Sequence, residues 1–214
     1  MTPRLFPTAV LVLLLAGCAT RPPPPDWQMD ARAALDGAVQ AQLTGNLRVA
    51  EADMARARSA LAATGRPGLL ARAELVLCAA RVASLDLDGC PAYFALARDA
   101  GPADRAYAAY LFGNAGPDDV PLLPAQHHGV ALGRTTAISA LPDPLARLVA
   151  AAVLLQQGRL DPAALAVAVE TASAHGWRRP LLAWLGLQRK AAEQAGQQEE
   201  ADRIRRRMDL AAPR

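Results

Sequence analysis

The residues of this chain that could do chemistry are few. Three cysteines occur, at Cys18, Cys78 and Cys90, and two of the three histidines, His127 and His128, are adjacent. Adjacent histidines on one element point in different directions, and no Cys, Asp or Glu stands near them at the spacing of zinc ligands. We therefore expect neither a metal site nor a cofactor.

The common catalytic motifs are also missing from the sequence. No Gly-x-Ser-x-Gly occurs, and no phosphate-binding glycine loop followed by Lys and Ser or Thr. Residues 86–89, Asp-Leu-Asp-Gly, begin like a calcium loop but lack its later ligands, so a helix-ending turn is the better interpretation. A thiol nucleophile at Cys78 or Cys90 would need an activating histidine, which the sequence alone does not place. We expect a protein that is not an enzyme; an enzyme whose site is assembled only in three dimensions is the alternative.

The first 18 residues have the order of an export signal. Arg4 gives a positive start, residues 5–15 are almost entirely apolar, and small residues precede Cys18. The apolar run is too short for a membrane-spanning helix, which needs about 20 residues. An ordinary secretory signal that happens to end near a cysteine is the alternative.

Leu15, Ala16, Gly17 and Cys18 resemble the lipobox of bacterial lipoproteins at all four positions. The resemblance implies cleavage after Gly17, a diacylglycerol on the thiol of Cys18, and a further acyl chain such as palmitate on the new amino terminus. One buried acyl chain anchors a protein only marginally, whereas two or three make residence in the membrane effectively permanent. Ala19 stands where an Asp would indicate inner-membrane retention. The implied location is therefore the outer membrane, with the body of the protein in the periplasm.

Once Cys18 carries lipid, Cys78 and Cys90 remain. An even number of cysteines in an oxidising compartment indicates a disulfide. The short loop that it would close corresponds to about 3 kcal/mol of stabilisation. Cys78 lies inside a predicted helix, so residues 84–89 must fold back to bring Cys90 beside it. The alternative is a pair of buried reduced thiols that act as small apolar side chains.

The composition favours an all-α fold. Alanine accounts for 50 of the 214 residues and isoleucine for two. Alanine and leucine are strong helix formers, and β-branched residues are scarce. Lys and Arg number 23 against 20 Asp and Glu, so cleavage before Cys18 leaves 22 against 20. This near balance gives little electrostatic attraction to nucleic acid, and we expect no nucleic-acid partner.

The chain divides into three predicted parts: a signal peptide at 1–17, a lipidated, proline-rich tether at 18–26, and a helical domain at 27–214. The four prolines at 22–25 predict a semi-rigid polyproline II spacer that holds the body away from the lipid headgroups, with a disordered joint as the alternative. Glycine and proline crowd residues 113–127. Such a break inside a domain is typical of a functional segment or a linker.

Apolar periodicity and capping residues predict a series of helices in this domain. Asp26 is the expected N-cap of the first helix, and Gly45-Asn46 is its expected stop. The predicted ranges are 27–44, 47–63, 69–85, 91–100, 103–112, 145–157, 162–175, 180–194 and 197–210, with a short helix within 128–141.

Several helix pairs resemble the hairpins of tetratricopeptide-type repeats, in which a Gly ends the first helix and a small residue five positions later lies on the packing face of the second. The pairs that follow this rule are Gly45–Ala50, Gly158–Ala163 and Gly196–Ala201. The first-helix signature is poor, and Gly158 and Gly196 are 38 residues apart instead of the 34 of that family. The resemblance covers about half of the chain. It implies an irregular stack of antiparallel helix hairpins, either a short solenoid or a compact helical domain.

Trp177 and Trp184 flank Arg178 and Arg179 near a predicted corner between two helices. Aromatic residues beside arginines are common in interface hot spots, so these four residues are predicted to contact a partner. The alternative is that both tryptophans fill the core.

The anchor, the tether and the helix pairs together predict a protein-interaction or assembly module held at the outer membrane through lipid on Cys18. The expected partner is another envelope protein. By fold analogy alone, a secretion or pilus component would be such a client. A structural envelope lipoprotein without a client and an envelope enzyme are the alternatives. A groove would favour the first interpretation, a smooth charged surface the second, and a deep pocket with a perturbed histidine or carboxylate the third.

Overall fold

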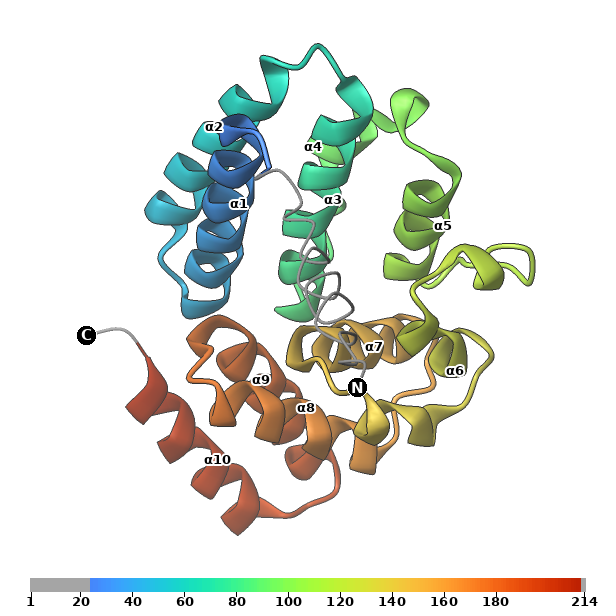
Figure 1. Ribbon diagram of the computed structural model, residues 1–214. Helices are drawn as coiled ribbons and strands as arrows, with labels where there is room; N and C mark the ends of the chain where they lie inside the picture. Colours follow the sequence, from blue (N-terminus) through green and yellow to red (C-terminus); the bar gives the residue numbers. More distant parts are fainter. Residues whose placement is uncertain (1–23, 213–214) are drawn as a thin grey trace, which may run out of the picture.

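The computed structural model describes residues 24–212 of the chain. Every regular element in this range is helical, which confirms the prediction of an all-α fold (Figure 1). The predicted signal peptide and the lipobox, including Cys18, lie outside the described residues, as does most of the predicted tether.

The helices agree with most predicted ranges to within two residues at each end. The α-helices are α1 (Asp26–Thr44), α2 (Leu47–Ala62), α3 (Pro67–Ala83), α4 (Pro91–Phe94), α5 (Pro102–Leu111), α6 (His128–Ala131), α7 (Pro144–Gln156), α8 (Pro162–Ala174), α9 (Arg178–Gln194) and α10 (Gln198–Ala211). Short 3-10 turns are η1 (Ala97–Asp99), η2 (Val120–Leu122), η3 (Ala125–His127) and η4 (Thr135–Ala140).

Two local predictions are corrected, and a third is confirmed. The helix expected at 91–100 stops at Phe94, because Leu96 leaves the helical region at φ −112° and ψ 0° before η1 begins. The short helix expected within 128–141 is present as α6, and a turn in which Gly133 has a φ of 85° separates it from η4. Pro25 occupies the N-cap of α1, which places Asp26 in the first turn. There its carboxylate still favours the helix dipole.

The first two helices form a hairpin whose turn follows from its sequence. Gly45 ends α1 in the left-handed conformation at φ 87°, and Asn46 then donates its backbone N–H to the carbonyl of Ala41 at 2.8 Å. The Asn46 side chain caps α2 by accepting from the N–H of Val49. The hairpin forms a small core together with α3. Its buried members are Ala31, Ala34, Ala38, Met54, Ala57, Leu61 and, from α3, Ala73.

Helix α3 lies at the centre of the molecule and is buried on several sides. It contacts α1, α2, α4, α5 and α7. The short side chains of Ala71, Ala79 and Ala80 are almost inaccessible to solvent, which lets neighbouring helices approach closely. The α1–α2 hairpin therefore packs against the single helix α3 and not against a second complete hairpin. This makes the stack of hairpins irregular.

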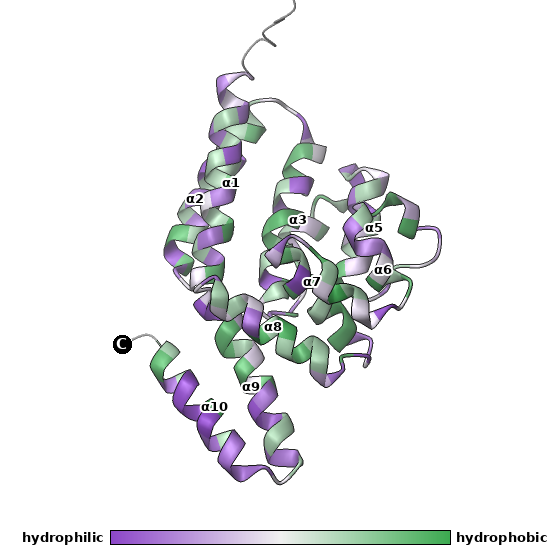
Figure 2. Ribbon diagram, turned by 60° about the horizontal axis from the view of Figure 1, so that its bottom comes forward, coloured by the Kyte–Doolittle hydropathy of each residue, from purple (hydrophilic) through white to green (hydrophobic). Residues whose placement is uncertain are grey.

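Helices α7, α8 and α9 form a second layer that lies across the lower ends of α1 and α3 (Figure 1). Each residue from Leu148 to Leu154 in α7 is inaccessible to solvent. Helix α10 packs on α9 and buries only Ala201 and Ile204, so most of its surface is hydrophilic (Figure 2). None of the helices among residues 24–212 has the length and apolar character needed to cross a membrane.

Candidate functional site

A polar cavity of about 370 Å³ opens where α1, α2, α3, α4 and α9 meet. Helix α2 lines it with Leu47, Ala50, Glu51 and Arg58, and α3 lines it with Glu74, Leu77, Cys78 and Arg81. The remaining lining residues are Gln42, Asp86, Cys90, Ala92, Tyr93 and Arg179. Its volume lies in the range of sites that bind small molecules or a few residues of a peptide.

One end of the cavity is negatively charged. Arg58 of α2 donates from Nε to Glu74 Oε1 at 2.6 Å and from Nη2 to Glu74 Oε2 at 3.2 Å, which joins α2 to α3. Its Nη1 also donates to Glu51 at 2.9 Å. These hydrogen bonds, led by those to Glu74, raise the pKa of Arg58 above its ordinary value. One guanidinium between two carboxylates leaves a formal charge of −1.

The other end of the cavity is positively charged. Arg81 of α3 donates from Nε and Nη2 to the two carboxylate oxygens of Asp86, each at 3.0 Å. Arg179 of α9 donates from Nη2 to the same Asp86 at 2.9 Å. The hydrogen bonds from Arg81 are the main cause of the lowered pKa of Asp86, so the carboxylate is ionised at neutral pH. Two guanidiniums around one carboxylate leave a formal charge of +1.

The backbone just before Asp86 is strained. Leu85 has a φ of 57° and is the one non-glycine residue with positive φ within residues 24–212. A side chain in this region costs about 1–2 kcal/mol. The N–H of Asp86 donates to the carbonyl of Arg81 at 3.0 Å, so this strained turn brings the Asp86 side chain back to the end of α3. Strain of this kind concentrates at functional sites.

Gln42 of α1 also lines the cavity. Its side chain is 5% exposed, and its Nε2 is one of four buried side-chain atoms without a hydrogen-bond partner in the described part of the chain. A buried donor without a partner costs about 1–3 kcal/mol. The cavity therefore contains a donor that an acceptor from outside could satisfy.

The disulfide between Cys78 and Cys90 is confirmed, with the two Cα atoms 5.7 Å apart. Residues 84–89 fold back as expected, and Gly89 turns the chain with a φ of 83° just before Cys90. Both cysteines are almost fully buried and line the cavity. The bridge holds the start of α4 against α3, and so fixes one wall of the cavity.

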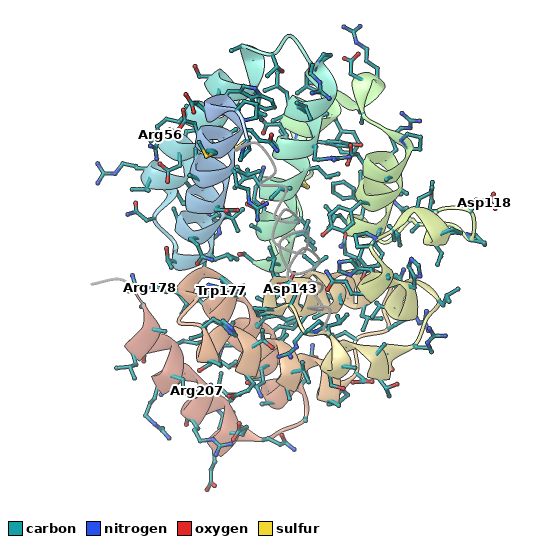
Figure 3. The ribbon with its side chains drawn as sticks, viewed as in Figure 1. Arg56, Asp118, Asp143, Trp177, Arg178 and Arg207 are labelled. Carbon is teal, nitrogen blue, oxygen red and sulfur yellow. A yellow bond between two sulfur atoms is a disulfide. The ribbon has the colours of Figure 1, made fainter. Side chains whose placement is uncertain are left out.

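The four residues predicted to contact a partner lie in different environments. Trp177 and Trp184 are buried, so the indoles fill the core as the alternative expected. The indole of Trp177 donates to Gln40 Oε1 at 3.3 Å, and that of Trp184 donates to the carbonyl of Ala83 at 3.0 Å. Arg178 is exposed at the junction of α1 and α9 (Figure 3), whereas Arg179 reaches the cavity.

His127 lies in the core and outside the cavity. It is 2% exposed, and its Nδ1 lies 3.2 Å from the hydroxyl of Tyr110 on α5. Burial lowers its pKa to about 4, so the ring is neutral at neutral pH. This contact holds the end of the glycine- and proline-rich segment 113–127 against α5. Among the described residues there is no cluster of His, Cys, Asp and Glu able to hold a metal ion.

Most of the charged residues of the cavity were not identified from the sequence. Arg58 and Glu74 are 16 positions apart and Asp86 and Arg179 are 93 apart, so no local spacing connects either pair. A weak signal was present in α3, where Arg72, Glu74 and Arg81 interrupt an otherwise apolar helix between Leu69 and Ala83. Charged residues in such a helix are rarely buried without a partner.

Comparison with known proteins gives one short similarity. No family model matches the chain, and no solved structure matches it. A stretch of 32 residues is 69% identical to the secretin XpsD of Xanthomonas campestris pv. campestris. This stretch is 15% of the present chain, and it corresponds to 4% of the length of that secretin.

Proposed function

We propose that this protein is a lipid-anchored lipoprotein of the outer membrane whose cavity binds a segment of an envelope partner, and that the partner is a secretin of an outer-membrane secretion system. The cavity is the observation that carries the proposal. It combines two ion-pair clusters of opposite charge with a buried unpartnered donor, and it is formed by residues from five helices.

Two further observations support the proposal. The sequence Leu15-Ala16-Gly17-Cys18 provides the anchor, because acyl chains on Cys18 would keep the helical body at a membrane surface. The 32-residue similarity to a secretin supports an association with an outer-membrane secretion system. A tethered protein with a recognition cavity is suited to escort or assemble such a partner.

The cavity favours recognition over the two alternative functions. Its three carboxylates, Glu51, Glu74 and Asp86, all form ion pairs with arginines, and the lowered pKa of Asp86 makes it a weak base. The histidine with a shifted pKa, His127, does not line the cavity. A purely structural lipoprotein would have no need of a strained turn or of an unpartnered donor at a cavity. The proposal therefore contains no catalytic step.

Co-purification from the bacterial host tests this function. The tagged full-length lipoprotein is extracted in detergent, and the secretin of the same host is detected by antibody. We expect the secretin to co-purify, and we expect deletion of the lipoprotein to reduce the fraction of secretin multimers in the outer membrane. The Arg179→Met variant should retain less secretin than its matched control, Arg178→Met. If the secretin neither co-purifies nor changes its distribution on deletion, the assignment of this partner is wrong.

A further inference from the structure

The charges, hydrogen bonds and boundaries of the cavity restrict what it can bind. Glu74 and Arg81 are seven residues apart on α3, so the negative and positive ends are separated by about 10 Å along the helix axis. A ligand with one charged group is therefore oriented by the cavity. A carboxylate is repelled at the Glu51–Glu74 end and attracted at the Arg81–Arg179 end.

The positive end of the cavity has more N–H hydrogen-bond donors than oxygen acceptors. A guanidinium has five N–H donors. Arg179 uses one nitrogen in its hydrogen bond to Asp86, and Arg81 uses two, while both side chains keep more than a quarter of their surface accessible. Gln42 adds the unpartnered Nε2. The groups that lack partners are thus N–H donors, which require an oxygen acceptor from the ligand.

Ion pairs between different helices line the cavity at both of its ends. At one end Arg58 of α2 binds Glu74 of α3, and at the other Arg179 of α9 binds Asp86 in the turn after α3. Both ion pairs stay intact if a ligand binds the free N–H groups of the arginines. An internal segment of a polypeptide brings a carboxylate to the positive end only where it holds an Asp or Glu side chain. The C-terminus of any polypeptide brings one, together with backbone carbonyls that accept hydrogen bonds.

From these three observations we infer that the cavity binds the C-terminal residues of a partner polypeptide, with the terminal carboxylate accepting hydrogen bonds from the N–H groups of Arg81 and Arg179 that Asp86 leaves free. A backbone carbonyl near the end of the chain accepts a hydrogen bond from Gln42 Nε2, and an apolar side chain packs on Leu47 and Leu77. The inference deepens the proposed function, because it names the chemical group that the same cavity recognises.

Peptide libraries test the inference without using the secretin. The full-length lipoprotein, in detergent, is incubated with fluorescent random hexapeptides that have free C-terminal carboxylates, and separately with the same library amidated at the C-terminus. Free-acid peptides should be retained at least about tenfold more strongly, since a charge-assisted hydrogen bond is worth roughly this factor. Equal retention of both libraries, or retention of amidated peptides that carry internal Asp or Glu, would show that a terminal carboxylate is not the recognised group. Retention of neither library would also overturn the inference.

Two variants locate the site. Arg179→Met should weaken retention by about tenfold, while Arg178→Met, one residue earlier on the same helix and exposed, should not. Gln42→Met should weaken retention and at the same time raise the melting temperature of the free protein, because it removes a buried donor that has no partner. Substitution of a residue that only supports the fold would not weaken peptide retention and raise the melting temperature at the same time. Unchanged retention in both Arg179→Met and Gln42→Met would show that peptides bind elsewhere.

The co-purification experiment and the peptide-library experiment can each fail without the other. If the secretin co-purifies but neither peptide library is retained, the proposed function stands and the terminal-carboxylate site does not. If free-acid peptides are retained through Arg179 while the secretin does not co-purify, the site stands and another partner must be sought.

Discussion

Arg179 Nη2 lies 2.9 Å from Asp86 Oδ2, although 93 positions separate the two residues in the chain. The contact joins the second layer of helices, through the first turn of α9, to the turn that ends α3. Asp86 also accepts two hydrogen bonds from Arg81. The positive end of the cavity therefore exists only when the two layers are docked, and one carboxylate holds both of its arginines in place.

Replacing Asp86 by Asn should destabilise the fold. The side chain of Asp86 is 16% exposed, so its ion pairs lie between surface pairs, which contribute less than about 1 kcal/mol, and fully buried ones, whose disruption costs about 3–5 kcal/mol. We expect a loss of about 2 kcal/mol and a fall in melting temperature of about 4–8 °C. Thermal unfolding followed by circular dichroism measures this change.

The matched control for this substitution is Asp118→Asn. Asp118 is exposed at the side of the molecule, far from the cavity (Figure 3), and should tolerate the change with a shift near zero. If both variants melt at the wild-type temperature, the three-residue cluster does not hold the two layers together.

The fold could be predicted from the sequence because its signals are local. Gly45 and Asn46 end one helix and begin the next, and Pro144 and Pro162 open α7 and α8 behind the capping side chains of Asp143 and Asp161. The segments predicted less well were short or irregular. In the 91–100 segment, tertiary packing of Tyr93 and the bridge to Cys90 outweigh the helix propensity of the alanines.

The candidate site could be predicted only in part, because its contacts are not local. The disulfide followed from the number of cysteines and the compartment, and it forms one wall of the cavity. The neighbouring tryptophans predict a partner contact for Arg179, but in the structure its ion pair is with Asp86, a residue for which the sequence predicts only a turn. Leu85 gave no signal in the sequence, since leucine rarely adopts a positive φ.

The stability of the fold should decrease as the pH falls from about 6.5 to about 4, and His127 should be a main cause. Burial lowers the pKa of His127 in the folded chain to about 4, whereas an unfolded histidine has a pKa near 6.5. Between these values the unfolded state takes up a proton that the folded state does not, so unfolding becomes more favourable. The full effect is on the order of 3 kcal/mol. Urea unfolding at pH 7 and at pH 4.5 measures it.

The His127→Gln variant isolates the contribution of this ring to the pH dependence. Glutamine does not titrate, so the loss of stability between pH 7 and pH 4.5 should be smaller in the variant than in the wild type. His175→Gln serves as the control, because it removes an exposed histidine and keeps His127, so the loss of stability that His127 causes should persist. An identical pH dependence in wild type and His127→Gln would exclude His127 as its source.

Replacing Cys18 by Ala should release the protein from the membrane. Without the thiol no diacylglycerol can be attached, so the variant should move from the detergent phase to the aqueous phase in Triton X-114 partitioning. The double variant Cys78→Ala/Cys90→Ala is the control, since it keeps the predicted lipid attachment site and should stay in the detergent phase. A Cys18→Ala variant that remains lipid-modified would refute the assignment of the lipobox.

Reduction of the Cys78–Cys90 bridge should lower the melting temperature without unfolding the protein at ambient temperature. The bridge spans a sequence separation of 12, and a loop of this size contributes about 3 kcal/mol by restricting the unfolded chain. In a domain of this length the loss corresponds to about 6–12 °C. Calorimetry with and without dithiothreitol measures the shift, and the double alanine variant, which has no bridge to reduce, should melt at the same temperature in both buffers. Thiol labelling of protein unfolded without reductant provides an independent check, because both cysteines should be protected. If both are labelled there, the bridge is absent from the protein and α4 is held against α3 by packing alone.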